Sequence, residues 1–123
     1  MQTVLIIEDN ADSARLVVRI LKPHGYRLLH ASDAESGLRM AVEEKPDLIL
    51  LDLGLPDLDG QTLIGLLKST PGLAGVPVVV TSAWPSDTAE PMVRAYGCDG
   101  YISKPISARQ FQAQIAAYLD KTP

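Results

Sequence analysis

The sequence lacks the features of a disulfide scaffold, a nucleic-acid surface or a membrane span. Its 123 residues include one cysteine, Cys98, which excludes an internal disulfide and a cysteine-based metal cluster. The chain has 11 Lys and Arg and 15 Asp and Glu, and the resulting net charge of −4 argues against a basic surface that binds nucleic acid. No apolar run approaches the roughly 18 residues of a transmembrane helix. We therefore expect no direct nucleic-acid binding and no membrane insertion.

The rest of the composition is typical of one soluble globular domain. Hydrophobic residues make up 46% of the chain and charged residues 21%. At this length we expect a single domain over residues 1–123, large enough to bury a core without disulfides or metals as staples. The first residues lead directly into an apolar run without the pattern of a signal peptide, so we expect a cytoplasmic protein.

The chain alternates between short aliphatic runs and segments with helical spacing. The predicted strands cover residues 4–7, 26–31, 48–51, 78–80 and 101–102. The predicted helices cover residues 11–22, the segment from Asp33 to Pro46, the segment from Asp59 to Pro71, residues 88–96 and a last helix that begins at Ser107. No hairpin signal separates the strands, which indicates parallel strands with right-handed crossovers. Strands apolar on both faces predict a doubly wound α/β sandwich.

Two prolines, Pro85 and Pro91, bracket the start of the predicted fourth helix. Proline is tolerated in a first helical turn but costs about 3 kcal/mol inside a helix. We therefore expect the fourth helix to be short or shifted.

Polar residues follow the aliphatic runs at the predicted strand ends. Glu8 and Asp9 follow the first run, Asp52 the third, Ser82 the fourth and Lys104 the fifth. In an open parallel sheet these ends form one crevice, which is where ligands bind. The five side chains are therefore expected to converge.

The residue types at these positions suit phosphoryl chemistry with a metal ion. Carboxylates that converge raise one another's pKa unless a cation neutralises them, and oxygen ligands of this kind suit Mg²⁺. An aspartate such as Asp52 can act as a nucleophile toward phosphorus and form an aspartyl phosphate. Lys104 would neutralise the phosphoryl oxygens, and the Ser82 hydroxyl would hydrogen-bond to one of them.

Five short motifs lie in register along essentially all 123 residues. One of these motifs is the segment from Asp52 to Gly60, in which Pro56 and Gly60 lie four and eight residues beyond Asp52. Ser82 fits the fourth-strand position better than Thr81, because Ser82 lies 22 residues before Lys104 and precedes a small residue. The full set is Glu8-Asp9, Asp52 to Gly60, Ser82-Ala83, Tyr101 and Lys104-Pro105. Together these motifs resemble those of response-regulator receiver domains of two-component signalling.

The resemblance implies a flavodoxin-like sandwich with a five-stranded parallel sheet in the order 2-1-3-4-5 and five helices. It implies that Asp52 accepts a phosphoryl group from a histidine kinase or a histidine phosphotransfer protein. Asp9, Asp52 and the backbone carbonyl of Gly54 would bind Mg²⁺, and Glu8 would act through a coordinated water. Lys104 would pair with the phosphoryl oxygens, and its peptide bond to Pro105 is expected to be cis.

The resemblance also implies a switch. Ser82 would hydrogen-bond to the phosphoryl group and Tyr101 would move inward, which changes contacts with a downstream protein. Such a domain is not an enzyme, although it assists its own phosphorylation and dephosphorylation. The motifs are most similar to those of stand-alone regulators and of hybrid-kinase receivers. Trp84 stands two residues beyond Ser82, and we hypothesise that it shields the acyl phosphate from water.

Three alternative functions remain open from the residues themselves. A phosphohydrolase with an aspartyl nucleophile would share Asp52, but such enzymes carry Asp-x-Asp and this chain has Gly54 at the third position. A flavin-binding domain needs a Gly-rich or Ser-rich loop after the first strand, where this chain is acidic. An interaction module that works without phosphorylation would lack Asp52, Asp9 or Lys104, and this chain has all three. Outside these motifs, Asp57 and Asp59 are interpreted as turn or cap residues, and no chemistry is assigned to Cys98, His24 or His30.

Overall fold

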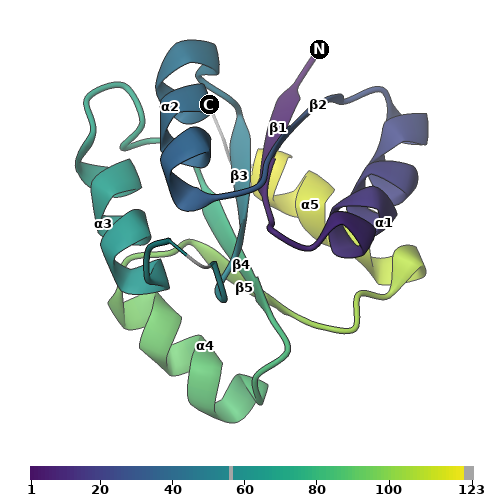
Figure 1. The fold of residues 1–123 in the computed structure, drawn as a ribbon. Coiled ribbons are helices and arrows are strands. Elements are labelled where there is room, and N and C mark those ends of the chain that lie inside the picture. Colours follow the sequence, from purple (N-terminus) through teal and green to yellow (C-terminus); the bar gives the residue numbers. More distant parts are fainter. Residues whose placement is uncertain (56, 121–123) are drawn as a thin grey trace.

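The computed structural model describes residues 1–55 and 57–120, and it shows a sheet between two layers of helices (Figure 1). The sheet has five parallel strands in the order β2-β1-β3-β4-β5, as predicted. The strands are β1 (Thr3–Ile7), β2 (Arg27–Ala31), β3 (Leu48–Asp52), β4 (Val78–Ser82) and β5 (Gly100–Ser103). The helices are α1 (Ala11–Leu21), the short 3₁₀ helix η1 (Lys22–His24), α2 (Ala34–Glu44), α3 (Gly60–Ser69), α4 (Ser86–Ala95) and α5 (Ala108–Asp120).

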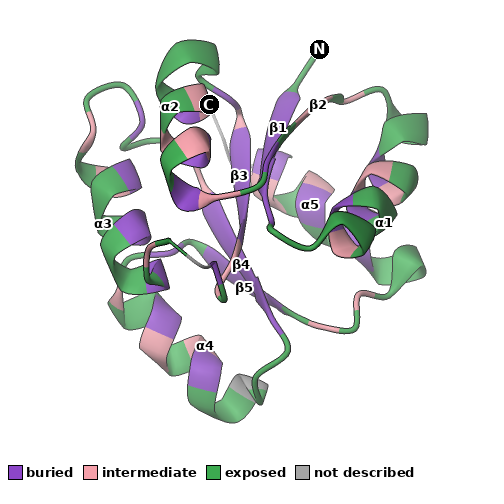
Figure 2. Cartoon of the chain, viewed as in Figure 1, coloured by how far each residue is buried: buried purple, intermediate pink, exposed green. Residues whose placement is uncertain are grey.

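Helices cover both faces of the sheet, and this explains why the central strands β1, β3 and β4 are largely apolar without alternation. Figure 1 shows α1 and α5 on one side and α2, α3 and α4 on the other. All five residues of β1 are buried, with Leu5 and Ile7 in one core cluster and Val4 and Ile6 in the other (Figure 2). Each of α1, α2, α3 and α5 buries a stripe of residues along one side of the helix. Among the described residues, no helix is long and apolar enough to cross a membrane.

Side-chain caps fix the start of three helices. Asn10, Asp33 and Asp59 precede α1, α2 and α3, and each accepts a hydrogen bond from the backbone N–H three residues later. Such caps satisfy donors that have no partner within the helix. The predicted cap role of Asp59 is confirmed, and Asp33 has the same role at the start of α2. α5 begins after Ser107, whose carbonyl accepts the N–H of Phe111.

The fourth helix was expected to be short or shifted, and the structure shows that it is not shortened relative to α3. α4 has ten residues, the same length as α3, although Pro91 lies inside it. Pro85 stands at the N-cap position, outside the helix, where its fixed φ is compatible with the start of the first turn. Pro91 removes only one helical N–H donor, and it is exposed, so water can satisfy the carbonyl that loses its partner.

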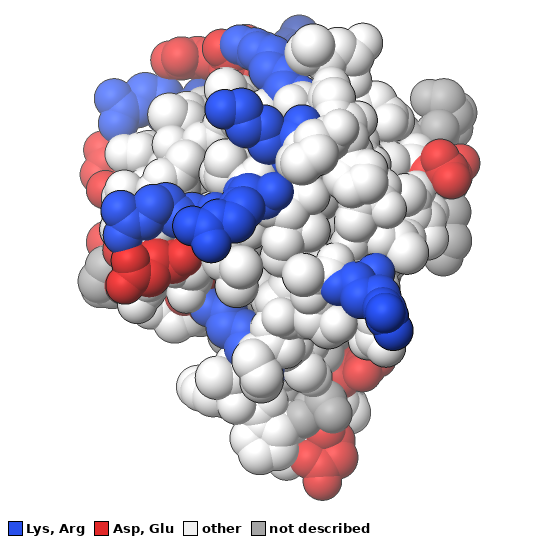
Figure 3. Space-filling view, turned by 90° about the vertical axis from the view of Figure 1, so that its right-hand side faces the viewer, with Lys and Arg blue, Asp and Glu red and all other residues white. Residues whose placement is uncertain are grey.

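The charged residues are unevenly distributed over the surface. Figure 3 shows the side of the molecule that carries α1 and α5, where Lys and Arg side chains gather although the chain is acidic overall. α1, η1 and β2 together contain Arg15, Arg19, Lys22 and Arg27. Arg15 pairs with Asp12, and Arg27 pairs with Glu44 of α2. The surface of the protein is therefore not uniformly acidic.

Candidate functional site

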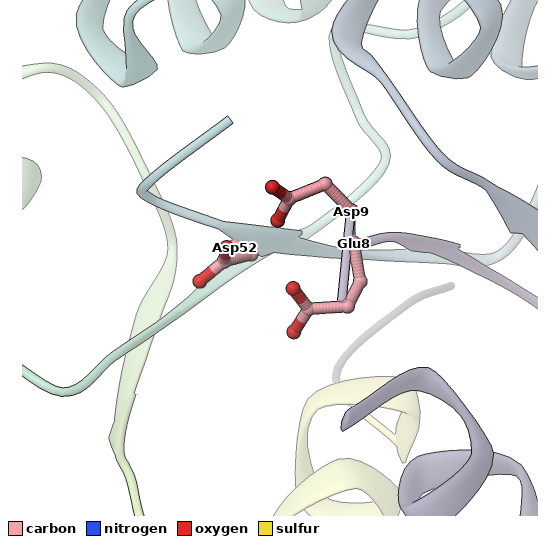
Figure 4. Close-up of side chains that lie close together, drawn as sticks. All are labelled: Glu8, Asp9 and Asp52. Carbon is pink, nitrogen blue, oxygen red and sulfur yellow. The ribbon is translucent and has the colours of Figure 1, made fainter. Parts of the chain in front are cut away.

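Three carboxylates converge at the carboxyl ends of β1 and β3. Glu8 and Asp9 lie directly after β1, and Asp52 is the last residue of β3. One carboxylate oxygen from each of the three lies within 4.8 Å of the others. Figure 4 shows the three side chains pointing their oxygen atoms into the same space. The predicted convergence of Glu8, Asp9 and Asp52 is thus present in the structure.

The pairing of the central strands explains this convergence. Ile7 of β1 lies opposite Leu51 of β3, so both strands end at the same level. The Glu8 N–H donates to the Ala31 carbonyl of β2, which extends the ladder by one residue and fixes the Glu8 backbone. α1 begins at residue 11, so the connection that carries Glu8 and Asp9 has little freedom to move away.

Lys104 reaches the same cluster from the end of β5. Its Nζ lies 2.9 Å from Glu8 Oε1 and 3.2 Å from Asp52 Oδ1. The side chains are 20% exposed for Lys104, 6% for Glu8 and 14% for Asp52, so these ion pairs are largely withdrawn from water. The Lys104 backbone N–H donates to the Ser82 carbonyl, which holds the end of β5 against β4. Its peptide bond to Pro105 is cis, as expected.

Burial and charge shift the pKa values of two of these groups. Burial raises the pKa of the Glu8 carboxyl, and the hydrogen bond from Lys104 opposes this shift without cancelling it. The nearby charge of Asp52 raises the Glu8 pKa further. Burial lowers the pKa of Lys104, but the hydrogen bond to Glu8 and the charges of Asp52 and Glu8 outweigh it, so the Lys104 pKa is raised overall. The lysine is therefore a stable positive charge at neutral pH.

The donor set fits a hard divalent cation. Three carboxylates and one ammonium leave an excess of two negative charges when all are ionised. Asp9 is exposed, which leaves access from solvent on that side. Oxygen donors without sulfur or imidazole in the cluster match the preference of Mg²⁺ or Ca²⁺. This cluster can therefore hold a metal ion.

Ser82 and Tyr101 both contact the connection that follows β4. Ser82 is buried, and its Oγ accepts the backbone N–H of Trp84 at 3.0 Å. The Tyr101 hydroxyl donates to the Trp84 carbonyl at 3.1 Å, and the Tyr101 side chain is already buried in this structure. Trp84 as a whole is 55% exposed. The backbone of Trp84 is thus fixed at both its polar groups.

Gly54 lies in the loop after β3, two residues beyond Asp52. The loop is exposed at Gly54, and a Cβ added there would lie 3.8 Å from Asp52 Oδ2. The Gly54 backbone is therefore next to the Asp52 carboxylate. Pro56, part of the predicted motif, lies outside the described residues.

Two residues near the site have partners that the sequence did not indicate. His30 was assigned no role, yet its Nε2 donates to the Glu8 carbonyl at 2.8 Å and so ties β2 to the backbone of the acidic pair. Asp57 was interpreted as a local turn or cap residue, but it caps α2, which lies 23 residues earlier. The signal available for the contact of His30 with Glu8 was its position near the end of β2, where it lies opposite Ile6 of β1. Cys98 is buried, and burial raises the pKa of its thiol.

Comparisons with known proteins agree on one family. The family model described as "Response regulator receiver domain" matches residues 4–116. The chain is 35% identical to the polar-differentiation response regulator DivK of Brucella anthropi over 118 residues, which is 96% of each chain.

Solved structures extend this similarity. A CheY-like response regulator receiver domain protein from Methanospirillum hungatei is 28% identical with a TM-score of 0.87, over 99% of this chain and 96% of that chain. The signal receiver domain of a signal transduction histidine kinase from Syntrophus aciditrophicus is 27% identical with a TM-score of 0.88, over 98% and 91% of the two chains. The similarity therefore includes both kinds of protein, a response regulator and a histidine kinase.

Proposed function

This chain belongs to the response regulator receiver domain family, and we propose that Asp52 accepts a phosphoryl group from the phosphohistidine of a histidine kinase or a histidine phosphotransfer protein. The observation that carries the proposal is the contact of Asp52 with Lys104 within a cluster completed by Glu8 and Asp9. We further propose that residues 1–123 form one domain of this kind and that it acts in the cytoplasm.

In this proposal the metal is Mg²⁺. Asp9, Asp52 and the Gly54 carbonyl would hold it, and Glu8 would contribute through a coordinated water. Bound there, the ion would offset negative charge on the phosphoryl oxygens. The convergence of the three carboxylates and the position of Gly54 beside Asp52 support this assignment.

The chain's own residues then account for the transfer. A carboxylate oxygen of Asp52 forms a bond to phosphorus, while the bond from phosphorus to the donor imidazole nitrogen breaks and that nitrogen keeps the electron pair. Lys104, which contacts Asp52 before transfer, is placed to pair with a phosphoryl oxygen afterwards. The acyl phosphate stays on this chain, so the domain turns over no separate substrate and assists only its own phosphorylation and dephosphorylation.

Ser82 and Tyr101 provide the route from the site to a downstream protein. The Ser82 oxygen accepts a hydrogen bond from the Trp84 N–H, and its own hydroxyl proton remains available for a phosphoryl oxygen. Tyr101 contacts the same connection through the Trp84 carbonyl. A shift of Ser82 toward the phosphoryl group would therefore act on the segment that Tyr101 holds, and on the surface of α4 and β5.

The first experiment tests the phosphoacceptor. The protein is incubated with Mg²⁺ and acetyl phosphate, and its intact mass is measured over time. We expect the wild-type protein to gain one phosphoryl group and Asp52→Ala to gain none, because the substitution removes the nucleophilic oxygen. Asp12→Ala, which removes an exposed carboxylate on α1, is the matched control and should be phosphorylated normally. Continuous phosphate release without an adduct would instead indicate a phosphohydrolase.

A second experiment concerns Trp84, which we propose shields the acyl phosphate from water. Trp84→Ala should shorten the lifetime of the phosphorylated protein by up to about tenfold, which corresponds to about 1.4 kcal/mol of barrier. The backbone contacts of residue 84 do not require the indole, so the substitution removes only the ring. The measurement is the decay of the adduct mass after acetyl phosphate is removed. Trp84→Phe keeps an aromatic ring and serves as the control; an unchanged decay in Trp84→Ala would contradict the shielding role.

A further inference from the structure

The carboxylate of Asp57 caps a helix from another part of the chain. Its two oxygens accept the backbone N–H groups of Ala34 at 2.9 Å and Glu35 at 3.1 Å, the first two residues of α2. Asp33 accepts the N–H of the third residue, Ser36, at 2.7 Å. The first N–H groups of a helix have no partner within it. Here two carboxylates from separate segments satisfy three of them.

Asp57 lies in the loop between β3 and α3, which also carries the proposed metal ligand Gly54. The start of this loop is fixed where the Leu53 N–H donates to the Thr81 carbonyl at 3.2 Å. Its end is fixed by Asp59, which caps α3. Between these two points, within the described residues, the hydrogen bonds from the loop to another element are those that Asp57 accepts.

Apolar contacts alone leave the path of this loop less defined. Leu55 is buried, and Leu53 and Leu58 pack against the same core cluster. Such contacts are not directional, whereas two hydrogen bonds to adjacent N–H groups set both distance and orientation. The positive end of the α2 dipole favours a carboxylate at this point as well. The hydrogen bond from Ala34 is the main cause of a lowered Asp57 pKa, so the carboxylate is ionised at neutral pH.

We propose that Asp57 is a positioning residue for the phosphoacceptor site. It uses the N-terminus of α2 as a fixed point and holds the loop so that the Asp52 carboxylate and the Gly54 carbonyl face Glu8 and Asp9. This inference rests on the proposed function, because it concerns the same metal and phosphoryl site. Residues that orient metal ligands without touching the metal commonly contribute about tenfold or more to affinity or activity.

The test compares Asp57→Ala with a control at the same helix end, Asp33→Ala. Both substitutions remove a carboxylate that caps α2, but only Asp57 connects the helix to the loop. Mg²⁺ affinity is measured by calorimetry, and Asp52 phosphorylation by intact mass with acetyl phosphate. We expect Asp57→Ala to weaken Mg²⁺ binding and to slow phosphorylation by about tenfold each, and Asp33→Ala to change neither. Asp57→Asn can accept only one of the two N–H groups well and should lie between wild type and Asp57→Ala.

The outcomes separate this inference from the proposed function. Equal Mg²⁺ affinity and phosphorylation rates in the two alanine variants would overturn the positioning role and leave Asp57 as a structural cap. If wild type formed no adduct that depends on Asp52, the proposed function would fail, and the Mg²⁺ affinities would still decide the role of Asp57. Urea unfolding of each variant identifies any that do not fold, and Asp57→Asn then replaces Asp57→Ala in the comparison.

Discussion

Replacement of Lys104 by methionine is expected to slow formation of the acyl phosphate at Asp52 by about 10²-fold. It should at the same time strengthen the binding of Mg²⁺. The two effects have opposite signs because one positive charge acts on two different partners. Lys104 lies 3.2 Å from the Asp52 carboxylate and is positioned to neutralise an incoming phosphoryl group. The same ammonium repels a cation bound by Glu8, Asp9 and Asp52, so its removal leaves a more negative site.

The free energy of unfolding of Lys104→Met should depend on whether Mg²⁺ is bound. Without Mg²⁺, the loss of Lys104 leaves the buried Glu8 carboxylate and Asp52 without their cationic partner, and breaking such a pair costs about 3 kcal/mol. Saturating Mg²⁺ should recover much of this loss, because binding to the folded state stabilises it. Urea unfolding with Mg²⁺ and with EDTA measures the difference.

Lys68→Met is the matched control for this prediction. Lys68 pairs with Asp99 and contacts the Val76 carbonyl, and neither partner belongs to the acidic cluster. Its removal should leave the phosphorylation rate and the Mg²⁺ affinity unchanged. Weaker Mg²⁺ binding in Lys104→Met, or an unchanged phosphorylation rate, would contradict the role given to Lys104.

The sheet and most of the site were predictable because each depends on local pattern and strand polarity. Aliphatic runs with no hairpin signal between them fix five parallel strands, and parallel strands bring their carboxyl ends together. Glu8, Asp52 and Lys104 therefore meet although 96 residues separate the first from the last. The strands could be predicted without an alternation of apolar and polar residues, because helices cover both faces of the sheet.

The remaining features depend on contacts that no local pattern encodes. Asp57 has the composition signal of a turn, and its partners on α2 follow only from the path of the loop in three dimensions. His30 contacts a backbone carbonyl, which any residue at position 8 would supply, so the sequence carries no paired signal for it. For α4, intrinsic propensity suggested a short helix, and packing of Ala89 and Val93 into the core outweighed the cost of Pro91.

Replacement of Phe111 by alanine is expected to lower the free energy of unfolding by about 3–5 kcal/mol. Phe111 is fully buried on α5 and belongs to a core cluster with Val79 and Ile102 of the sheet. The loss combines the transfer free energy of the ring with the cavity that remains between α5 and the sheet. Since domains of this size are stable by about 5–15 kcal/mol, the variant should unfold at much lower urea concentration.

Two further variants decide whether this cost arises from packing of α5 on the sheet. Phe111→Leu fills most of the space and should cost clearly less than Phe111→Ala. Val42→Ala removes an apolar side chain that is 48% exposed on α2, and its effect should stay within about 0.5 kcal/mol. A loss in Phe111→Ala no larger than that in Val42→Ala would contradict the packing of α5. In the sequence, Lys104 lies in the connection from β5 to α5. A loosened α5 should therefore also weaken the ion pairs of Lys104 with Glu8 and Asp52. The fraction of Phe111→Ala that remains folded should then be phosphorylated more slowly than the wild-type protein.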